Sequence, residues 1–205
     1  MRLDDFQITN GVITKYLGEA KNVIIPEGIT GIGKCAFFAS DIVSVSLPSG
    51  VTSIETSAFS YCRQLADISI PETVTNIGEW AFSHCTSLTG IKIPNGIKSI
   101  NQEAFDGCIK LETVDIPDSV AVICYYAFYE CESLKSVRLS NGLISIEDGA
   151  FSNCPSLSSI EIPDGVTCIG NRAFMHCAGL KIVSVPKSVT YIGKQAFYGC
   201  PRIKI

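Results

Sequence analysis

The sequence predicts a solenoid built mainly from short parallel strands, a fold in which repeated coils stack and share one core. Three observations predict it: a 23-residue unit recurs along the chain, aliphatic and polar residues alternate within each unit, and the composition favours β-branched residues. The 205 residues include 27 Ile and 14 Val against 11 Leu, and branched side chains suit the pleated surface of a strand.

An Ala-Phe dipeptide marks the repeat. Its Phe recurs after one step of 22 residues and then after six steps of 23. From the second copy onward a Cys follows three residues after the Phe, and a Leu or Ile follows three residues after the Cys. We expect the eight Phe side chains to stack into a spine through the core. They are Phe37, Phe59, Phe82, Phe105, Phe128, Phe151, Phe174 and Phe197.

Each unit contains three predicted elements. A segment such as Ile91-Lys92-Ile93 alternates with period two, which predicts a short strand whose aliphatic side chains face the core. The Val-x-x-Ile segment after the Pro predicts a second extended piece on the opposite wall. The apolar positions around Ala-Phe have the spacing of one helix face, which predicts a short helical or 3-10 turn. In one unit these positions are Ala81, Phe82, Cys85 and Leu88.

The pattern C-x-x-L-x-x-I-x-I-P-x-x-V-x-x-I-x-x-x-A-F resembles the BspA-like, treponemal-type class of bacterial leucine-rich repeats over residues 23–205. The chain departs from it locally, because Ser140 stands where Pro is expected and Asn101, Cys124 and Glu147 stand where Gly is common. The resemblance implies a right-handed, curved leucine-rich-repeat solenoid used as a binding surface, often in adhesion to host or matrix proteins. It supplies no catalytic residues.

The two ends of the solenoid differ. Residues 1–22 lack the repeat, and Asn10-Gly11 between two alternating stretches predicts a β-hairpin that caps the first coil. Residues 23–205 then form about eight repeats with no clear C-terminal cap, because the chain stops within a strand at Ile203-Lys204-Ile205. Three alternatives stay open: a longer natural chain, a pairing edge that gives a weak end-to-end dimer, or a monomer whose Lys204 discourages association.

The ten cysteines raise the question of a disulfide framework, a metal site or buried thiols. Seven of them form the repeat column, where stacked side chains are parallel and do not converge as a disulfide or a tetrahedral metal shell requires. We therefore expect buried free thiols, with no metal and no cofactor. Cys35, Cys124 and Cys168 lie outside the column, and we expect them to be partly exposed.

The sequence predicts no enzyme. His84 and His176 occupy the same repeat position four coils apart, too far to share a metal or a catalytic site. Each precedes a core Cys that points inward, and no third orienting group recurs. No nucleotide-binding, hydrolase or zinc-protease motif is present, so no catalytic residue is assigned.

Two sets of side chains are candidate partner-binding residues. The first is the solvent-facing column Lys92, Asp115, Arg138 and Glu161, whose charges alternate and are expected to pair between neighbouring strands. It is either a self-neutralised ladder or a recognition strip. The second is the aromatic group Trp80, Tyr125, Tyr126 and Tyr129 at variable positions beside Ala-Phe. These either shield the turns or anchor a partner.

Charge and hydropathy argue against two classes of function, nucleic-acid binding and membrane insertion. A net charge of −4 without a basic cluster predicts no binding of nucleic acid, and the nine-residue apolar run 120–128 is too short to insert in a membrane. We expect a non-enzymatic protein–protein interaction module. The alternative is a cell-surface adhesin or antigen fragment. The absence of a signal peptide and the many thiols favour the cytoplasm, and a fragment of a longer protein would instead belong at the cell surface or be secreted.

Overall fold

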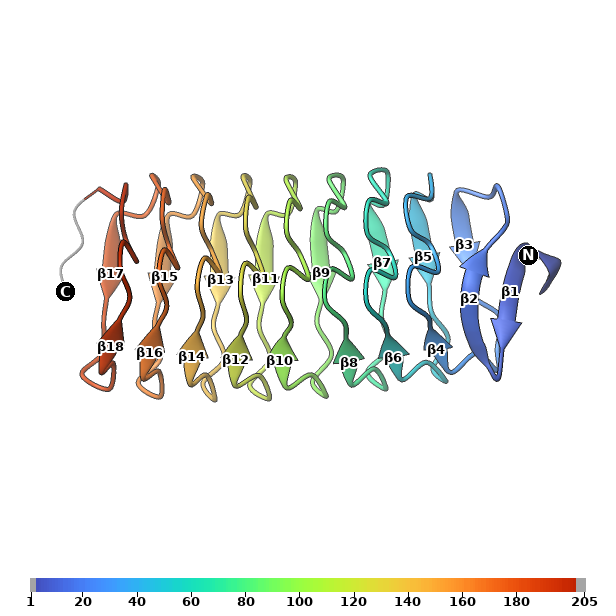
Figure 1. Ribbon diagram of the computed structural model, residues 1–205, viewed down its shortest axis with the longest axis horizontal. Helices are drawn as coiled ribbons and strands as arrows, with labels where there is room; N and C mark the ends of the chain where they lie inside the picture. The colour runs from blue at the N-terminus through green and yellow to red at the C-terminus, as the bar shows by residue number, and fades with distance from the viewer. Residues whose placement is uncertain (1–2, 202–205) are drawn as a thin grey trace.

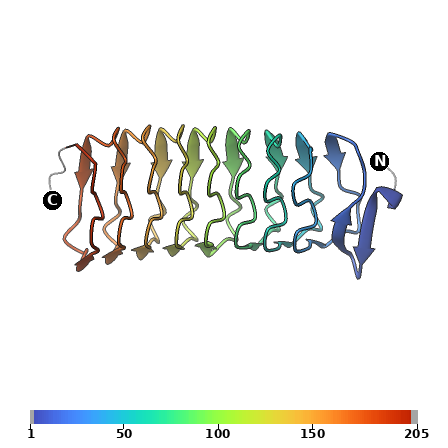
Figure 2. The same ribbon diagram turned by 45° about the horizontal axis from the view of Figure 1, so that its top comes forward.

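The computed structural model describes residues 3–201 as a single stack of coils, with β1 and β18 at opposite ends of its long axis (Figure 1). Each coil contributes a three-residue strand, a two-residue strand and a tight turn. The stack therefore has three walls, which we call the long-strand wall, the short-strand wall and the turn wall, the last built from the segments around each Ala-Phe pair. Its axis is nearly straight in both views (Figures 1 and 2), so little of the curvature implied by the family resemblance is seen.

The strands alternate between the two strand walls along the chain. The long-strand wall comprises β3 (Asn22–Ile24), β5 (Ser44–Ser46), β7 (Asp67–Ser69), β9 (Gly90–Lys92), β11 (Thr113–Asp115), β13 (Ser136–Arg138), β15 (Ser159–Glu161) and β17 (Ile182–Ser184). The short-strand wall comprises β4 (Gly31–Ile32), β6 (Ser53–Ile54), β8 (Asn76–Ile77), β10 (Ser99–Ile100), β12 (Val122–Ile123), β14 (Ser145–Ile146), β16 (Cys168–Ile169) and β18 (Tyr191–Ile192).

Burial follows the period-two pattern that predicted the strands. In β11 the side chain of Val114 is buried, while its neighbours Thr113 and Asp115 are exposed. The parallel register places Val114 directly between Ile91 and Val137 of the adjacent coils. Equivalent aliphatic residues thus stack in one continuous core, which confirms the predicted solenoid of parallel strands.

The turn wall is not helical, contrary to the predicted helical turn. Two residues in each turn adopt left-handed backbone, as do Trp80 (φ 55°) and His84 (φ 57°), and an α-helix needs φ near −63° at every position. Within residues 3–201 the one helical element is the 3-10 segment η1 (Leu3–Asp5). The predicted inward direction is nevertheless right, because Phe82 and Cys85 are fully buried.

The eight Phe rings form the predicted spine. Consecutive ring centroids from Phe37 to Phe197 lie 5.0 to 5.5 Å apart, and from Phe59 onward the rings are parallel within 7°. Backbone bonds in the turn wall hold this spacing, since Phe82 N–H donates to the carbonyl of Ala104 in the next coil at 2.8 Å. The spine therefore ties each coil to its two neighbours.

The hairpin predicted from Asn10-Gly11 is present. Strands β1 (Phe6–Thr9) and β2 (Val12–Tyr16) pair antiparallel, and β2 also pairs in parallel with β4 of the short-strand wall. Tyr16 stacks on Phe37 at 5.0 Å and so extends the aromatic spine, with Phe6 packed beyond it. The cap boundary at residue 22 stays a prediction, and the strand predicted at 203–205 lies outside the described residues.

One junction interrupts both strand walls, and we call it the joint. Within residues 3–201, β7 does not pair with β9 and β8 does not pair with β10, and the coils are visibly wider apart there (Figure 1). At this point the side-chain Nδ2 of Asn101 donates to the carbonyl of Ile77 at 2.6 Å. In neighbouring coils a backbone N–H makes the equivalent bond, as from Gly78 to Ile54 at 2.7 Å. The turn wall continues unbroken across the joint.

Candidate functional site

The charged column predicted to bind a partner lies on the exposed face of the long-strand wall. Its members are Lys92, Asp115, Arg138 and Glu161, on β9, β11, β13 and β15. Arg138 pairs with Asp115 as predicted, but Lys92 Nζ lies 2.7 Å from Glu72 Oε1 instead of pairing with Asp115. In the described part of the chain Arg138 and Glu161 form no ion pair. The predicted ladder is therefore only partly right, because carboxylates in the loops compete for the cations.

These loop carboxylates belong to a clasp that occurs twice. In each copy an acidic loop residue holds an Asn and a cation of the next coil: Glu72 holds Asn95 and Lys92, and Asp118 holds Asn141 and Arg138. Asp118 Oδ1 accepts hydrogen bonds from Asn141 N at 3.0 Å and from Arg138 Nη1 at 3.1 Å. The bond from the Asn141 backbone, followed by the Arg138 contact, lowers the pKa of Asp118. The clasp fixes the direction of the Arg138 side chain.

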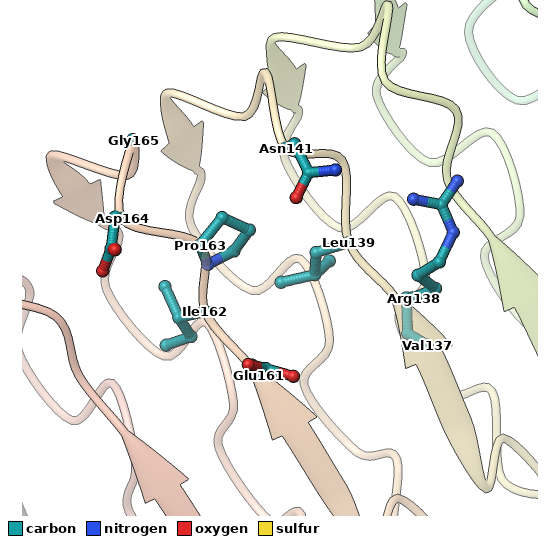
Figure 3. A pocket seen from close by; sticks show the side chains of 9 residues that line it. All are labelled: Val137, Arg138, Leu139, Asn141, Glu161, Ile162, Pro163, Asp164 and Gly165. Carbon is teal, nitrogen blue, oxygen red and sulfur yellow. The ribbon is translucent and has the colours of Figure 1, made fainter.

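A groove opens beside Arg138 where two strands separate. Strands β13 and β15 pair only through Ser136 and Ser159, whereas β11 and β13 are paired along all three residues. The space beyond the single pair is a pocket of about 520 Å³ (Figure 3). Its lining is Val137, Arg138, Leu139, Asn141, Glu161, Ile162, Pro163, Asp164 and Gly165.

The loop that borders the groove is held by Ser140, the residue that replaces the expected Pro. Its buried hydroxyl donates to the carbonyl of Val120 at 2.7 Å and accepts from Gly142 N at 3.0 Å. A Pro has no side-chain hydroxyl and makes neither bond. The replacement of the expected Pro by Ser140 therefore coincides with the place where β13 and β15 separate.

The groove separates one neutralised cation from two unpaired carboxylates. Arg138 on one side is matched by Asp115 and Asp118. Glu161 and Asp164 lie on the β15 side (Figure 3), and within residues 3–201 neither side chain forms an ion pair or a hydrogen bond. A carboxylate accepts hydrogen bonds only, so this side of the groove favours a Lys or Arg side chain of a ligand.

The four predicted aromatic residues lie on the turn wall, away from the charged column. Tyr125 and Tyr126 are 48% and 37% exposed. Tyr126 meets Tyr129 edge to face at 5.4 Å, and Tyr129 Oη accepts a hydrogen bond from Asn153 Nδ2 at 3.1 Å. Trp80 is half-buried two coils away. The structure thus brings Tyr126 and Tyr129 together but does not unite the aromatic and charged sets in one site.

The cysteine column is a set of free thiols, as predicted, but its members are more than small apolar residues. All ten cysteines are free, and the column from Cys62 to Cys177 is fully buried. Each column thiol donates to a Phe carbonyl in the preceding coil, as Cys108 Sγ does to Phe82 at 3.2 Å. Burial raises the pKa of Cys62 to about 12. Of the other three, Cys35 is exposed, and Cys124 and Cys168 are half-buried.

The two histidines sit in separate surroundings. His84 lies beside Tyr61, with its Nε2 3.7 Å from Asp106 Oδ2, whereas His176 lies beside Tyr198. Across residues 3–201, no three His, Cys, Asp or Glu side chains are grouped to hold a metal ion. In the same residues no helix has the length and apolar character needed to cross a membrane.

The sequence interpretation missed several site residues. Asp118, Asn141 and Asp164 share one loop position whose residue type varies between repeats, so the consensus gave that position no weight. One sequence signal could have indicated the clasp. Glu72 and Asp118 are acidic residues at the same repeat position, and each is followed one repeat later by an Asn. The aromatic row formed by Phe38, Tyr61 and His84 was also missed.

Comparison with solved structures shows close likeness to bacterial repeat proteins. A leucine-rich repeat protein of T. pallidum, TpLRR, is 34% identical with a TM-score of 0.80, covering 88% of this chain and 90% of that one. One from Bacteroides ovatus is 31% identical with a TM-score of 0.86, covering 95% of this chain and 55% of that one. A leucine rich cell surface protein from Faecalibacterium prausnitzii is 32% identical with a TM-score of 0.58, covering 90% and 59%.

No curated protein matched the sequence. The family model described as the BspA type leucine rich repeat region, in six copies, matches residues 14–125 and 98–205. These two matches include every coil of the solenoid, and a fold of this kind is typical of protein-interaction modules. The chain belongs to the BspA-type leucine-rich repeat family.

Proposed function

We propose that this chain is a non-enzymatic interaction module that binds a protein partner through the groove between β13 and β15. The observation that carries the proposal is the pair of unmatched carboxylates, Glu161 and Asp164, which line a groove whose other side carries Arg138, held by its own clasp. A rigid wall that presents charge in a fixed position favours specific recognition, because little side-chain entropy is lost on binding.

The partner that fits this groove is a polypeptide loop carrying a Lys or Arg. Its cation would lie against Glu161 or Asp164, and its flanking apolar atoms would cover Leu139 and Ile162, which also line the pocket. The clasp keeps Arg138 from folding across and neutralising Glu161. The chain's net charge of −4 adds a general attraction for a basic partner.

Two compartments are compatible with this role. The ten free thiols support a reducing compartment such as the cytoplasm. The relative from Faecalibacterium prausnitzii is described as a cell surface protein, which supports the second candidate, an adhesin or antigen that binds host or matrix proteins. Fractionation of the source cells, followed by surface labelling of intact cells, separates the two candidates.

The binding test uses capture on the intact chain under reducing conditions. Glu161→Lys should reduce capture of the bound partner by about tenfold or more, because it places a cation where the ligand's cation belongs. Asp164→Lys should behave in the same way. Glu79→Lys is the matched control, since Glu79 is an exposed carboxylate outside the groove. Equal capture by wild type and Glu161→Lys would exclude the groove as the binding site.

A further inference from the structure

Three aromatic rings follow one another on successive coils near the N-terminal end of the turn wall. Phe38 and Tyr61 have ring centroids 5.6 Å apart, and Tyr61 and His84 have centroids 4.6 Å apart. Phe38 is 51% exposed and Tyr61 is 38% exposed, so both present ring surface to solvent. The row is separate from the Tyr126–Tyr129 pair and from the groove between β13 and β15.

The backbone conformation at this row does not favour aromatic residues. Tyr61 and His84 both have left-handed backbone, with φ of 61° and 57°. The same repeat position is occupied by Gly107, Asn153 and Gly199 in three other coils and by Ala39, Glu130 and His176 in the remaining three. Gly and Asn are the residues that adopt this conformation most readily. A bulky Tyr there is unfavourable for the backbone, so its presence points to a role at the surface.

Two of these rings, Phe38 and Tyr61, border a shallow pocket of about 370 Å³ that also has polar lining residues. Its lining is Phe38, Ala39, Asp41, Tyr61, Arg63 and Gln64. The Arg63 guanidinium lies 5.7 Å from the Tyr61 ring centroid. Within residues 3–201 the side chains of Asp41, Arg63 and Gln64 make no hydrogen bond or ion pair. The pocket therefore combines exposed aromatic rings with three side chains that are available for hydrogen bonds to a ligand. The Asp41 carboxylate accepts, the Arg63 guanidinium donates, and the Gln64 amide does both.

We propose that this pocket binds a neutral saccharide. A sugar hydroxyl both donates and accepts hydrogen bonds, so it matches Asp41, which only accepts, and Arg63, which only donates. The C–H face of a pyranose ring is apolar and packs on an aromatic ring such as Tyr61. The charges of Asp41 and Arg63 cancel, which favours an uncharged sugar.

A proline-rich peptide is the competing ligand, because extended proline segments also bind aromatic-lined grooves. Proline has no backbone N–H, so such a segment leaves the acceptor Asp41 without a donor. The pocket around Tyr126 and Tyr191 offers a useful contrast. Several of its polar side chains already bond to each other, as Arg172 Nε does to Gln195 Oε1 at 3.0 Å and Asn171 Nδ2 does to Asp148 Oδ2 at 2.9 Å.

The test is calorimetric titration of the intact chain with neutral hexasaccharides of glucose, mannose, galactose, xylose and N-acetylglucosamine. We expect at least one to bind, and Tyr61→Ala to weaken that binding by about tenfold or more through lost ring contact. Asp41→Asn should weaken it by a similar factor through loss of a charged acceptor. Tyr198→Ala is the matched control, because Tyr198 is an exposed aromatic residue in another coil and its loss should change nothing.

Three results would overturn the proposal: no hexasaccharide binds, binding is insensitive to both variants while their thermal unfolding is unchanged, or a proline-rich peptide binds in a Tyr61-dependent way and no sugar does. Glu161→Lys is included because it lies in the other groove. It should leave saccharide binding intact, so that failure of the protein-binding proposal and failure of this one give different results.

Discussion

At the residue scale, Asp106 is the carboxylate whose surroundings are least favourable for its charge. Its side chain is 11% exposed, accepts a hydrogen bond from Ser83 Oγ at 3.3 Å and lies beside His84. Burial raises its pKa from 3.8 to about 6, His84 opposes the rise, and Glu103 and Glu130 add to it. The folded state therefore holds the Asp106 proton more tightly than the unfolded state does.

This difference predicts a pH dependence of stability. As the pH rises from 3.8 to about 6, the unfolded state loses the proton first, so the free energy of unfolding should fall by up to about 3 kcal/mol. Asp106→Asn should remove this fall, and urea unfolding across that interval measures it. The exposed Asp164→Asn is the control and should leave the slope as it is in wild type. An unchanged slope in Asp106→Asn would contradict the prediction.

The cysteine column makes a second prediction at this scale. Cys108 Sγ donates to the buried carbonyl of Phe82, which also accepts a hydrogen bond from Cys85 N–H. Cys108→Ala removes one of these two donors and should lower the free energy of unfolding by about 1 kcal/mol. Cys108→Ser keeps a donor and should cost less. Cys35→Ala changes an exposed thiol and should have no effect. Denaturant unfolding under reducing conditions compares the three, and equal stability of Cys108→Ala and wild type would show that the bond is unimportant.

At the element scale, the joint is the place where backbone bonding between coils is weakest. Ala121 N–H donates to Lys98 across the next junction at 2.9 Å, and Thr75 N–H donates to Thr52 across the previous one at 2.9 Å. In the described residues Lys98 N–H has no such bond to Thr75. Side chains bridge the gap instead, through Asn101 to Ile77 and Lys92 to Glu72.

Amide hydrogen exchange should therefore locate the joint. We expect the amide of Lys98 to exchange faster than the amides of Thr75 and Ala121, because it has no bond to the neighbouring coil. Asn101→Gly removes the side chain that competes for the Ile77 carbonyl, and should slow exchange at Lys98 by letting the backbone bond form as it does at Gly78. Equal exchange at Lys98 and Ala121 in wild type would mean that the joint is closed in solution.

The sequence predicted the elements better than the contacts between them. The strands, the Phe spine and the inward Cys column could be predicted because each depends only on which residues are buried. The apolar positions that recur every 23 residues indicate those residues. The turn geometry was mispredicted because two left-handed residues such as Trp80 and His84 give the same inward spacing as a helix. The ion-pair partners of Lys92 and Arg138 include carboxylates in the loops. The strand register predicts which strand residues are neighbours, but it does not predict which loop side chains contact them.

At the scale of the whole molecule, stability is a sum of contacts between neighbouring coils. Each coil touches only the next, so an uncovered end exposes one apolar face and one strand edge. The hairpin β1–β2 covers both at the N-terminal end. Tyr16 and Phe6 cover the ring of Phe37, which is fully buried, and β2 pairs with the edge of β4.

Removal of residues 1–16 should therefore convert the chain into a self-associating species. The exposed Phe37 face and the open edge of β4 would meet the same surfaces of another copy, because a paired strand edge and a buried ring are both favourable. Light scattering after size-exclusion chromatography measures the mass. Removal of residues 1–4 alone keeps both hairpin strands and should leave the mass distribution as in the full chain. A truncated chain lacking residues 1–16 with that same distribution would show that the hairpin does not act as the cap.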